Sequence, residues 1–238
     1  LSKYLVTLAE DPELRRRMGQ RLYQKAEADY SLESTCRRQL EIYDTILRRQ
    51  ARPASRRDGA LVCGAYGRGN AGDAAILEAI VTELRQVDPD LPVWVLSRRP
   101  KDTRLKYRVN SIYTFAFPKF LARMVRTRLY INGGGSLLQD VTSYRSLWFY
   151  LFTISAAKIL GNKVLMYGCG IGPIRSDANR ARAARVLQKR VDIITLRDTH
   201  SREELRRMEV THPEIIQSAD PTVILPAASA EIIDGVME

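Results

Sequence analysis

The stretch ALVCGAYGRGNAGDAAILEAIVTELRQV (residues 60–87) decides the fold, because it passes from an apolar strand through a glycine-rich loop into a helix. Residues 60–66 form an apolar run of the length expected for a buried strand. Residues 73–87 repeat apolar side chains at helical spacing, on the face made by Ile76, Leu77, Ile80, Val81, Leu84 and Val87. A unit of this kind is typical of a parallel sheet covered by helices.

The same alternation continues to residue 218. We expect further strands at residues 92–97, 128–132, 163–167, 192–196 and 215–218. We expect an apolar helix that ends at residue 157, a helix over 176–190, and a short helix that begins at Ser201 with the capping box Ser201-x-x-Glu204. The pattern predicts the α/β class with a doubly wound parallel sheet, in which ligands bind beyond the carboxyl ends of the strands.

Residues 1–57 differ from the rest of the chain, since they hold only one of its fourteen glycines. Asp11-Pro12-Glu13 has the composition of a helix start, and apolar residues then recur at helical spacing as far as Tyr43 and Leu47. Residues 51–58 combine proline, serine and charge without periodicity. We therefore expect a helical segment over 1–50, a linker over 51–58 and the α/β region from 59 to 225.

The composition excludes several classes of protein. The chain has 238 residues, 45% of them hydrophobic, which excludes a mostly disordered protein. Its three cysteines (Cys36, Cys63 and Cys169) are too few for a disulfide scaffold and are expected to be reduced packing residues. The net charge of +11 would suit nucleic acid, but the arginines lie on predicted helix faces without interleaved aromatics. We therefore expect no nucleic-acid partner.

The sequence has no secretory signal and no apolar run of the length that a membrane span needs. Its most apolar run, LWFYLFTISAA (147–157), suits a buried helix, with an interfacial helix as the alternative. We expect a cytoplasmic protein, with peripheral contact to the inner face of the membrane left open. The chain opens at Leu1 without an initiating Met, so we also expect it to be a piece of a longer protein.

The first glycine-rich loop is a candidate anion site. Gly67, Gly69, Asn70 and Gly72 lead into Asp73 at a helix start, where backbone N–H groups favour a phosphate. A tight turn that needs small residues is the structural alternative.

The same loop also fits the dinucleotide spacing Gly-x-Gly-x-x-Gly, and Ser97-Arg98-Arg99 could bind the 2′-phosphate of NADP. Two features weigh against NADP. Asp73 would repel a pyrophosphate, and Asp88 and Asp90 precede the second predicted strand instead of following it.

A second candidate follows the strand at 128–132. Ordering Gly133, Gly134 and Gly135 costs conformational entropy, so a simple connector would seldom contain three glycines in a row. We therefore expect a functional role, in which their backbone amides are uncovered and line a cleft. The residues after them, Ser136, Gln139 and Asp140, add polar side chains at a predicted helix start.

Two further strand ends carry polar or glycine-rich sequence. Gly168-Cys-Gly170-Ile-Gly172-Pro173 suits a turn. Arg197, at the end of the strand 192–196, is either an anchor for a carboxylate or phosphate, or the partner of Asp198 in a salt bridge. His200 and His212 have no other ligand residues at metal-binding spacing, so we expect no metal site.

Five stretches resemble, in the same order, the polysaccharide pyruvyl transferase family: GAYGRGNAGDAAIL (64–77), INGGGSLLQDVTSYRSLWFYL (131–151), GCGIGPI (168–174), ITLRDTHSREEL (194–205) and SADPTVIL (218–225). The resemblance implies transfer of the pyruvyl unit of phosphoenolpyruvate to a sugar hydroxyl, often as a ketal on a cell-surface glycan. It also implies a two-domain, glycosyltransferase-like fold, with residues 59–225 as its Rossmann-like first half and 226–238 as the start of the second.

A second resemblance concerns DPELRRRMGQRLYQKAEADYS (11–31), which is similar to the C-terminal tail of a family of retaining glycosyltransferases. The two resemblances together imply a fusion of a glycosyltransferase with a pyruvyl transferase. The sequence departs from the pyruvyl transferase pattern at Ala74 and His200, where that family more often has acidic residues. The family's second half contributes a histidine and an arginine to the cleft, so we expect a fragment without it to be inactive.

On this basis we expect Arg197 to anchor the anion, with Asp73 and Asp140 as the carboxylates available for proton transfer. The alternative for either aspartate is to bind sugar hydroxyls or to cap a helix. The expected ligands are phosphoenolpyruvate as donor and a glycan or lipid-linked saccharide as acceptor, with no cofactor. A sugar-nucleotide glycosyltransferase and a non-catalytic glycan-binding domain of the same fold remain the alternatives.

Overall fold

The computed structural model describes residues 2–31, 33, 36, 40 and 57–226 and divides the chain into two compact units, Leu1–Ala54 and Ser55–Glu238. In the first unit, helix α1 (Ser2–Glu10) precedes helix α2 (Pro12–Tyr30). The Asp11 carboxylate caps α2 by accepting from the Leu14 amide at 2.8 Å, and Pro12 stands in the first turn, as predicted. The predicted stripe through Tyr43 and Leu47, linker residues 51–56 and residues 227–238 lie outside the described residues.

The second unit contains a seven-stranded sheet in which every strand is parallel to its neighbours, so the predicted fold class is confirmed. The order across the sheet is β3-β2-β1-β4-β5-β6-β7. The strands are β1 (Ala60–Cys63), β2 (Val93–Ser97), β3 (Asn110–Tyr113), β4 (Leu129–Leu138), β5 (Lys163–Ile171), β6 (Ile193–Leu196) and β7 (Glu214–Gln217).

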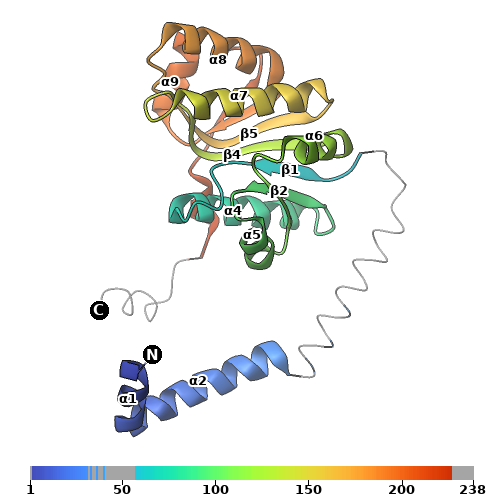
Figure 1. Cartoon of the computed structure of the whole chain (residues 1–238). Coiled ribbons are helices and arrows are strands. Elements are labelled where there is room, and N and C mark those ends of the chain that lie inside the picture. Colours follow the sequence, from blue (N-terminus) through green and yellow to red (C-terminus); the bar gives the residue numbers. More distant parts are fainter. Residues whose placement is uncertain (1, 32, 34–35, 37–39, 41–56, 227–238) are drawn as a thin grey trace. The chain divides into compact units, whose positions relative to one another are not determined.

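Helices cover both faces of this sheet (Figure 1), as a doubly wound fold requires. Helices α4 and α5 lie on one face, and α6, α7, α8 and α9 lie on the other. Their bounds are α4 (Ala71–Val87), α5 (Pro100–Tyr107), α6 (Phe117–Arg126), α7 (Tyr144–Ile159), α8 (Asp177–Arg190) and α9 (Thr199–Arg207), and a short 3₁₀ helix, η1 (Pro221–Ile224), follows β7.

Each face of the sheet has its own apolar layer. Ile76, Leu77 and Ile80 of α4 pack against β1 and β4, while Leu147 and Ile154 of α7 belong to the larger layer on the opposite face. The apolar face predicted for α4 is therefore buried, except at its end, where Val87 is exposed. Both layers leave the carboxyl ends of the strands free to carry loops.

The sequence pattern predicts no elements over residues 98–127, which form α5, β3 and α6 in the structure. Their signals are weak for physical reasons. Thr103 is the one buried residue of the highly charged α5, β3 is only four residues long, and Ala116 at the start of α6 makes no side-chain cap.

The predicted capping box at Ser201 is wrong. Helix α9 begins earlier, and its cap is Asp198, whose carboxylate accepts from the Ser201 amide at 2.7 Å. The Ser201 hydroxyl is buried and accepts from the Ile171 amide at 2.8 Å, so it ties α9 to β5.

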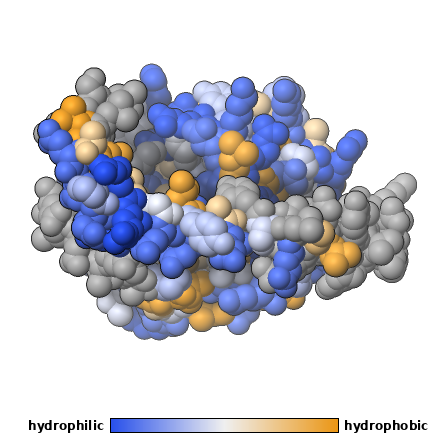
Figure 2. Space-filling model, turned by 90° about the horizontal axis from the view of Figure 1, so that it is seen from below, coloured by the Kyte–Doolittle hydropathy of each residue, from blue (hydrophilic) through white to orange (hydrophobic). Residues whose placement is uncertain are grey.

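Within the described residues, no helix combines the length and the apolarity that crossing a membrane would need. Hydrophilic residues predominate in the view from below, and hydrophobic residues lie among them (Figure 2).

Candidate functional site

The order of the strands reverses between β1 and β4, where the chain winds first toward β3 and then toward β7. Loops that leave neighbouring strands in opposite directions open a crevice at such a switch point. The connection from β1 to α4 and the end of β4 meet here, and these are the two glycine-rich segments identified in the sequence.

The β1–α4 connection begins with a turn that is packed closely against β2. Gly67 has a φ of +76°, and a Cβ atom there would lie 2.3 Å from the Ser97 hydroxyl oxygen. Gly69 also has a positive φ (+84°), but a Cβ there would meet nothing within 4 Å. Gly67 is thus required for packing, while Gly69 is surrounded by open space.

Asn70 caps the helix that follows, since its side-chain oxygen accepts from the Asp73 amide at 3.1 Å. Gly72 is exposed in the first turn of α4. The start of α4 therefore lies at the edge of the crevice, where a helix start was expected from the sequence.

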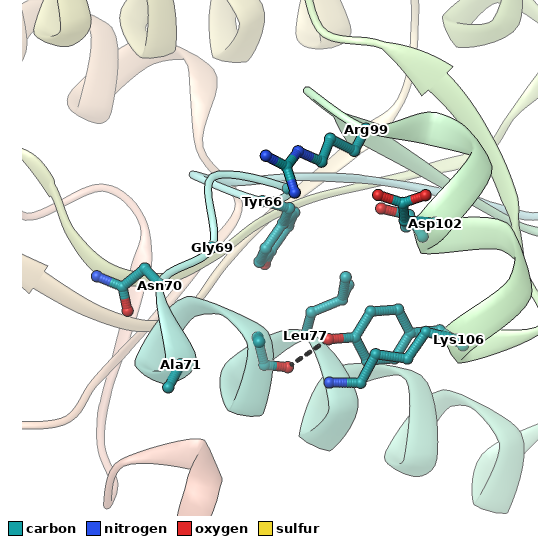
Figure 3. Close-up of a pocket in the computed structure, with 12 residues that line it drawn as sticks. Tyr66, Gly69, Asn70, Ala71, Leu77, Arg99, Asp102 and Lys106 are labelled. Carbon is teal, nitrogen blue, oxygen red and sulfur yellow. Dashed lines mark hydrogen bonds between the residues drawn. The ribbon is translucent and has the colours of Figure 1, made fainter. Parts of the chain in front are cut away.

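A pocket of about 360 Å³ lies beside this connection, between α4 and α5 (Figure 3). Gly69 and Ala71 line it from the α4 side, and Arg99, Asp102 and Lys106 line it from the α5 side. Ala74 and Tyr107 also line it, and the Tyr107 hydroxyl donates to the Ala74 carbonyl at 3.1 Å, which joins α5 to α4.

A second hollow of about 460 Å³ shares Gly67 and Arg99 with this pocket. It is also lined by Arg68 and Arg98, which are both exposed. Three arginines thus line one hollow beside the β1–α4 connection, which favours an anion. The Arg98 guanidinium also lies 4.0 Å from the ring centre of Phe115. We call Arg68, Arg98 and Arg99 the basic lip.

The triple glycine is part of β4 and is not a loop, so that prediction is wrong. A Cβ at Gly133 would lie 2.4 Å from the Ile80 side chain, and one at Gly134 would lie 2.1 Å from that of Ile76. The Tyr66 hydroxyl also donates to the Gly133 carbonyl at 3.0 Å. These two glycines let α4 approach the sheet closely, and both are buried.

Gly135 is the member of the triplet that faces the crevice. Its φ is +73°, and a Cβ there would lie 3.4 Å from the Asp73 carboxylate. The next residue, Ser136, is exposed, and its hydroxyl accepts from Arg197 Nη2 at 3.2 Å. The structure therefore brings Asp73, Gly135, Ser136 and Arg197 together, although they come from three separate parts of the sequence.

The Arg197 guanidinium is also held by acidic residues. Its Nη1 donates to Asp220 at 2.9 Å, and its Nε lies 3.8 Å from the Asp198 carboxylate. Partial burial alone would raise the pKa of Asp220, but hydrogen bonds from Thr222 and from Arg197 hold that pKa below its usual value. Asp220 is thus a charged partner that fixes the direction of Arg197. We call Asp73, Ser136, Arg197 and Asp220 the crevice cluster.

Asp73 has the opposite electrostatic character. Burial raises the pKa of its carboxyl above the usual value, and the charges of Arg68 and Arg197 offset part of that increase. A carboxyl that retains its proton more readily than an ordinary aspartate is suited to general acid chemistry.

Asp140 lies in a different environment from Asp73. Its carboxylate accepts from the Arg175 amide at 2.7 Å, the Ser176 amide at 3.1 Å and Asn179 Nδ2 at 2.9 Å. Although slight burial acts to raise the pKa of Asp140, these hydrogen bonds lower it below its usual value. Asp140 joins the β4–α7 turn to the start of α8.

Gln139 is similarly occupied in its own turn. Its side-chain oxygen accepts from the amides of Val141 and Thr142 at 2.7 and 3.0 Å, and its side-chain nitrogen contacts the Thr142 hydroxyl. Of the second predicted glycine-rich segment, Ser136 thus belongs to the crevice cluster, and Gly135 lies against it.

The described residues contain no group of three or more histidine, cysteine, aspartate or glutamate side chains that could hold a metal ion. Cys63 and Cys169 are buried, and Cys36 is exposed. Burial raises the pKa of the Cys63 thiol to about 11, so this thiol is a poor nucleophile at neutral pH.

Sequence reasoning assigned no role to Asp220 or to Arg68. Asp220 lies in the stretch SADPTVIL (218–225), quoted above for its family resemblance, so a signal was present. The sequence indicates Arg98 and Arg99 only as part of an NADP site, and the structure places them in the basic lip.

Comparison with known families adds one match. The family described as Polysaccharide pyruvyl transferase matches residues 70–236, which is more than half of the chain and includes α4, the end of β4, Arg197 and Asp220. No curated protein and no solved structure matches the chain.

Proposed function

Since the chain belongs to the polysaccharide pyruvyl transferase family, we propose that its crevice takes part in transferring the pyruvyl unit of phosphoenolpyruvate to a glycan. Members of this family are transferases with a pyruvyl donor and a glycan acceptor. The identity of the donor as phosphoenolpyruvate, of the acceptor as a cell-surface or lipid-linked saccharide, and of the product as a ketal belong to the proposal.

The two charged ends of phosphoenolpyruvate match two groups of cations. Arg197, oriented by Asp220 and Ser136, would bind the carboxylate. The basic lip and the first amides of α4 would bind the phosphate. In the crevice cluster, the carboxylates of Asp73 and Asp220 offset the positive charge of Arg197. The basic lip, which contains three arginines, therefore supplies most of the positive charge that a phosphate needs.

The proposed reaction joins two sugar hydroxyls to one carbon. A proton is added to the methylene carbon of phosphoenolpyruvate, and a sugar hydroxyl attacks the neighbouring carbon. A second hydroxyl then replaces the phosphate, which leaves with its bridging oxygen, so the two hydroxyl protons balance the new methyl hydrogen and the released hydrogen phosphate. Asp73 is the residue that we assign to proton transfer, because its carboxyl has a raised pKa.

The observation that carries this proposal is the position of Asp73. It combines a carboxyl of raised pKa with two guanidinium groups close enough to act on its charge, at the switch point of the sheet. Arg68 comes from the basic lip and Arg197 from the end of β6, so an anion bound between them would lie next to the proton donor.

The proposal is tested with the full-length protein, because a fragment without the family's second half is expected to be inactive. Calorimetry measures the binding of phosphoenolpyruvate, and an assay with a glycan acceptor measures phosphate release. We expect Asp73→Asn to retain binding and to lower phosphate release by about 10²–10⁴-fold, the usual contribution of a positioned acid or base. Asp177→Asn, at the exposed start of α8, is the matched control and should leave both measurements unchanged.

The anchor is tested in the same way with Arg197→Ala. We expect this variant to weaken phosphoenolpyruvate binding by roughly tenfold or more, since a charge-assisted hydrogen-bonded pair is lost. Arg202→Ala, at an exposed position of α9, is its control. Equal binding by the Arg197→Ala and Arg202→Ala variants would remove the anchor from the proposal.

A nucleotide-sugar transferase is the second candidate, and the pocket between α4 and α5 favours it. This pocket lies at the carboxyl end of β2, where Rossmann-like sheets commonly hold a nucleoside. The resemblance of residues 11–31 to a glycosyltransferase tail is consistent with this candidate. Binding of uridine diphosphate sugars with no binding of phosphoenolpyruvate would favour it over pyruvyl transfer, and binding of a glycan alone would favour a non-catalytic domain.

A further inference from the structure

Helix α7 has an exposed apolar stripe in addition to its buried side. Leu147, Leu151 and Ile154 are buried against the sheet. On the outer side, large apolar residues recur mostly at four-residue steps with much of their surface exposed: Tyr144 (49%), Trp148 (44%), Phe152 (44%) and Ile159 (66%). A helix that only covers a sheet would carry polar side chains at these positions.

Helix α6 extends this surface. Val125 is 51% exposed, and the Phe117 ring lies 5.9 Å from that of Phe152 between ring centres. Between the two helices runs a groove of about 450 Å³ with almost entirely apolar walls, to which Val125, Phe152 and Ile159 contribute. We call the exposed residues Phe117, Val125, Tyr144, Trp148, Phe152 and Ile159 the α6–α7 face.

The two helices that form this face carry charges of one sign. Neither α6 nor α7 contains an acidic residue, whereas Lys119, Arg126 and Arg145 are exposed on them. From α8, the Arg182 guanidinium lies 4.7 Å from the ring centre of Trp148.

Carboxylates beside these helices are hydrogen-bonded or ion-paired. Asp140 accepts from Asn179 Nδ2 at 2.9 Å, and Asn179 in turn accepts from the Trp148 indole N–H at 2.9 Å. Asp192 is bound by Lys158 at 2.6 Å, and Asp177 at the start of α8 contacts Arg180 at 3.5 Å. The α6–α7 face is therefore apolar at its centre and cationic at its edges.

We propose that the α6–α7 face docks on the surface of an anionic lipid bilayer. Tryptophan and tyrosine side chains favour the boundary between water and hydrocarbon, and arginine and lysine at the edges attract anionic headgroups. The groove between α6 and α7 would receive lipid hydrocarbon. The helices lie on this surface without crossing it, as interfacial helices do. The inference is independent of pyruvyl transfer, since it uses none of the residues of the crevice cluster or the basic lip.

The experiment is co-sedimentation of the full chain with vesicles of phosphatidylcholine alone and with vesicles that also contain phosphatidylglycerol. We expect binding to the anionic vesicles only, and weaker binding at high salt because salt screens the attraction. The double variant Phe152→Glu/Ile159→Glu should lower binding by roughly tenfold or more, because two apolar side chains that would be buried in the lipid are replaced by charged ones.

The matched control is Leu105→Glu, which changes an exposed leucine (83%) on α5, on the opposite face of the sheet. This variant should bind like the wild type. A third variant, Lys119→Gln/Arg126→Gln, should lower binding to anionic vesicles by roughly fivefold for each charge removed. Circular dichroism melting of every variant checks that folding is unchanged.

Three results would overturn the proposal. The first is equal binding to neutral and anionic vesicles. The second is a double variant that binds like the Leu105→Glu control, which would assign any binding to another part of the chain. The third is a wild-type dimer, seen by analytical ultracentrifugation, that the double variant converts to a monomer, because the face would then be an interface between copies.

Discussion

The β1–α4 connection and the end of β4 have similar sequences and opposite physical roles. Each is rich in glycine and is followed by an aspartate: Gly64, Gly67, Gly69 and Gly72 precede Asp73, and Gly133–Gly135 precede Asp140. In the first segment, Gly69 is open to a pocket and the pKa of Asp73 is raised. In the second, side chains of α4 occupy the space where Cβ atoms of Gly133 and Gly134 would stand, and hydrogen bonds lower the pKa of Asp140.

This difference shows what a glycine run can and cannot indicate. A glycine is selected wherever a Cβ would not fit, and the obstacle can be a ligand or the protein's own helix. Only the atoms around each position distinguish these cases. The following substitutions separate the two segments, beginning with the largest expected effect.

Gly134→Ala should be the most destabilising change. The new Cβ would lie 2.1 Å from the Ile76 side chain, at a backbone φ of +57° that alanine rarely adopts. Overpacking and backbone strain together should lower the free energy of unfolding by roughly 2–5 kcal/mol, measured by denaturant titration.

A second variant tests whether the clash is the cause. Adding Ile76→Ala to Gly134→Ala removes the atoms that collide, so the two changes together should cost less than the sum of their separate costs. Strict additivity would mean that Gly134 is not a packing glycine.

Asp140→Ala should have the next largest effect. It removes the acceptor for two amides and for the Asn179 side chain, which hold the β4–α7 turn to α8. Water can replace part of these bonds near the surface, so we expect a loss of about 1–2 kcal/mol in the free energy of unfolding. Asp140→Asn, which keeps one acceptor oxygen, should lose less. If a variant that is still folded under the assay conditions released phosphate much more slowly than the wild type, Asp140 would have a chemical role in addition to this structural one.

Gly69→Ala should cost less again. Its Cβ would meet nothing within 4 Å, so only the strain of a positive φ remains, about 1 kcal/mol by equilibrium unfolding. The added methyl group would stand at the edge of the pocket beside α4. A loss as large as that of Gly134→Ala would end the contrast between the two segments.

The sequence was sufficient for the fold class, whereas the roles of the predicted site residues stay predictions. Hydrophobic periodicity predicted the parallel sheet, and Arg197 at the end of β6 was identified as a candidate anion anchor. The packing role of Gly133 and Gly134 could not be predicted, because Ile76 and Ile80 reach them only after α4 has folded onto the sheet. The roles of Asp73 and Asp140 depend in the same way on partners from other loops.

The smallest expected effect is the change in the free energy of unfolding at pH 7 when Asp73 or Asp140 is replaced by asparagine. Its sign should differ between the two substitutions. The pKa of Asp73 is raised in the folded chain, so its ionised form is favoured less there than in the unfolded chain. The stability associated with this group is fully present below the ordinary pKa of aspartate and is lost as the pH rises through the raised value. Asp73→Asn has no charge to bury, so we expect it to be slightly more stable than the wild type at pH 7, and this advantage should disappear in acid.

Asp140→Asn should behave in the opposite way, because the folded chain favours the ionised form of Asp140. It should be less stable than the wild type at pH 7, and the difference should shrink as the pH falls through the lowered pKa of Asp140. Denaturant midpoints of the wild type and both variants across this pH range measure both differences. If Asp73→Asn also destabilised the chain at pH 7, Asp73 would be a structural carboxylate like Asp140, and its assignment to proton transfer would fail.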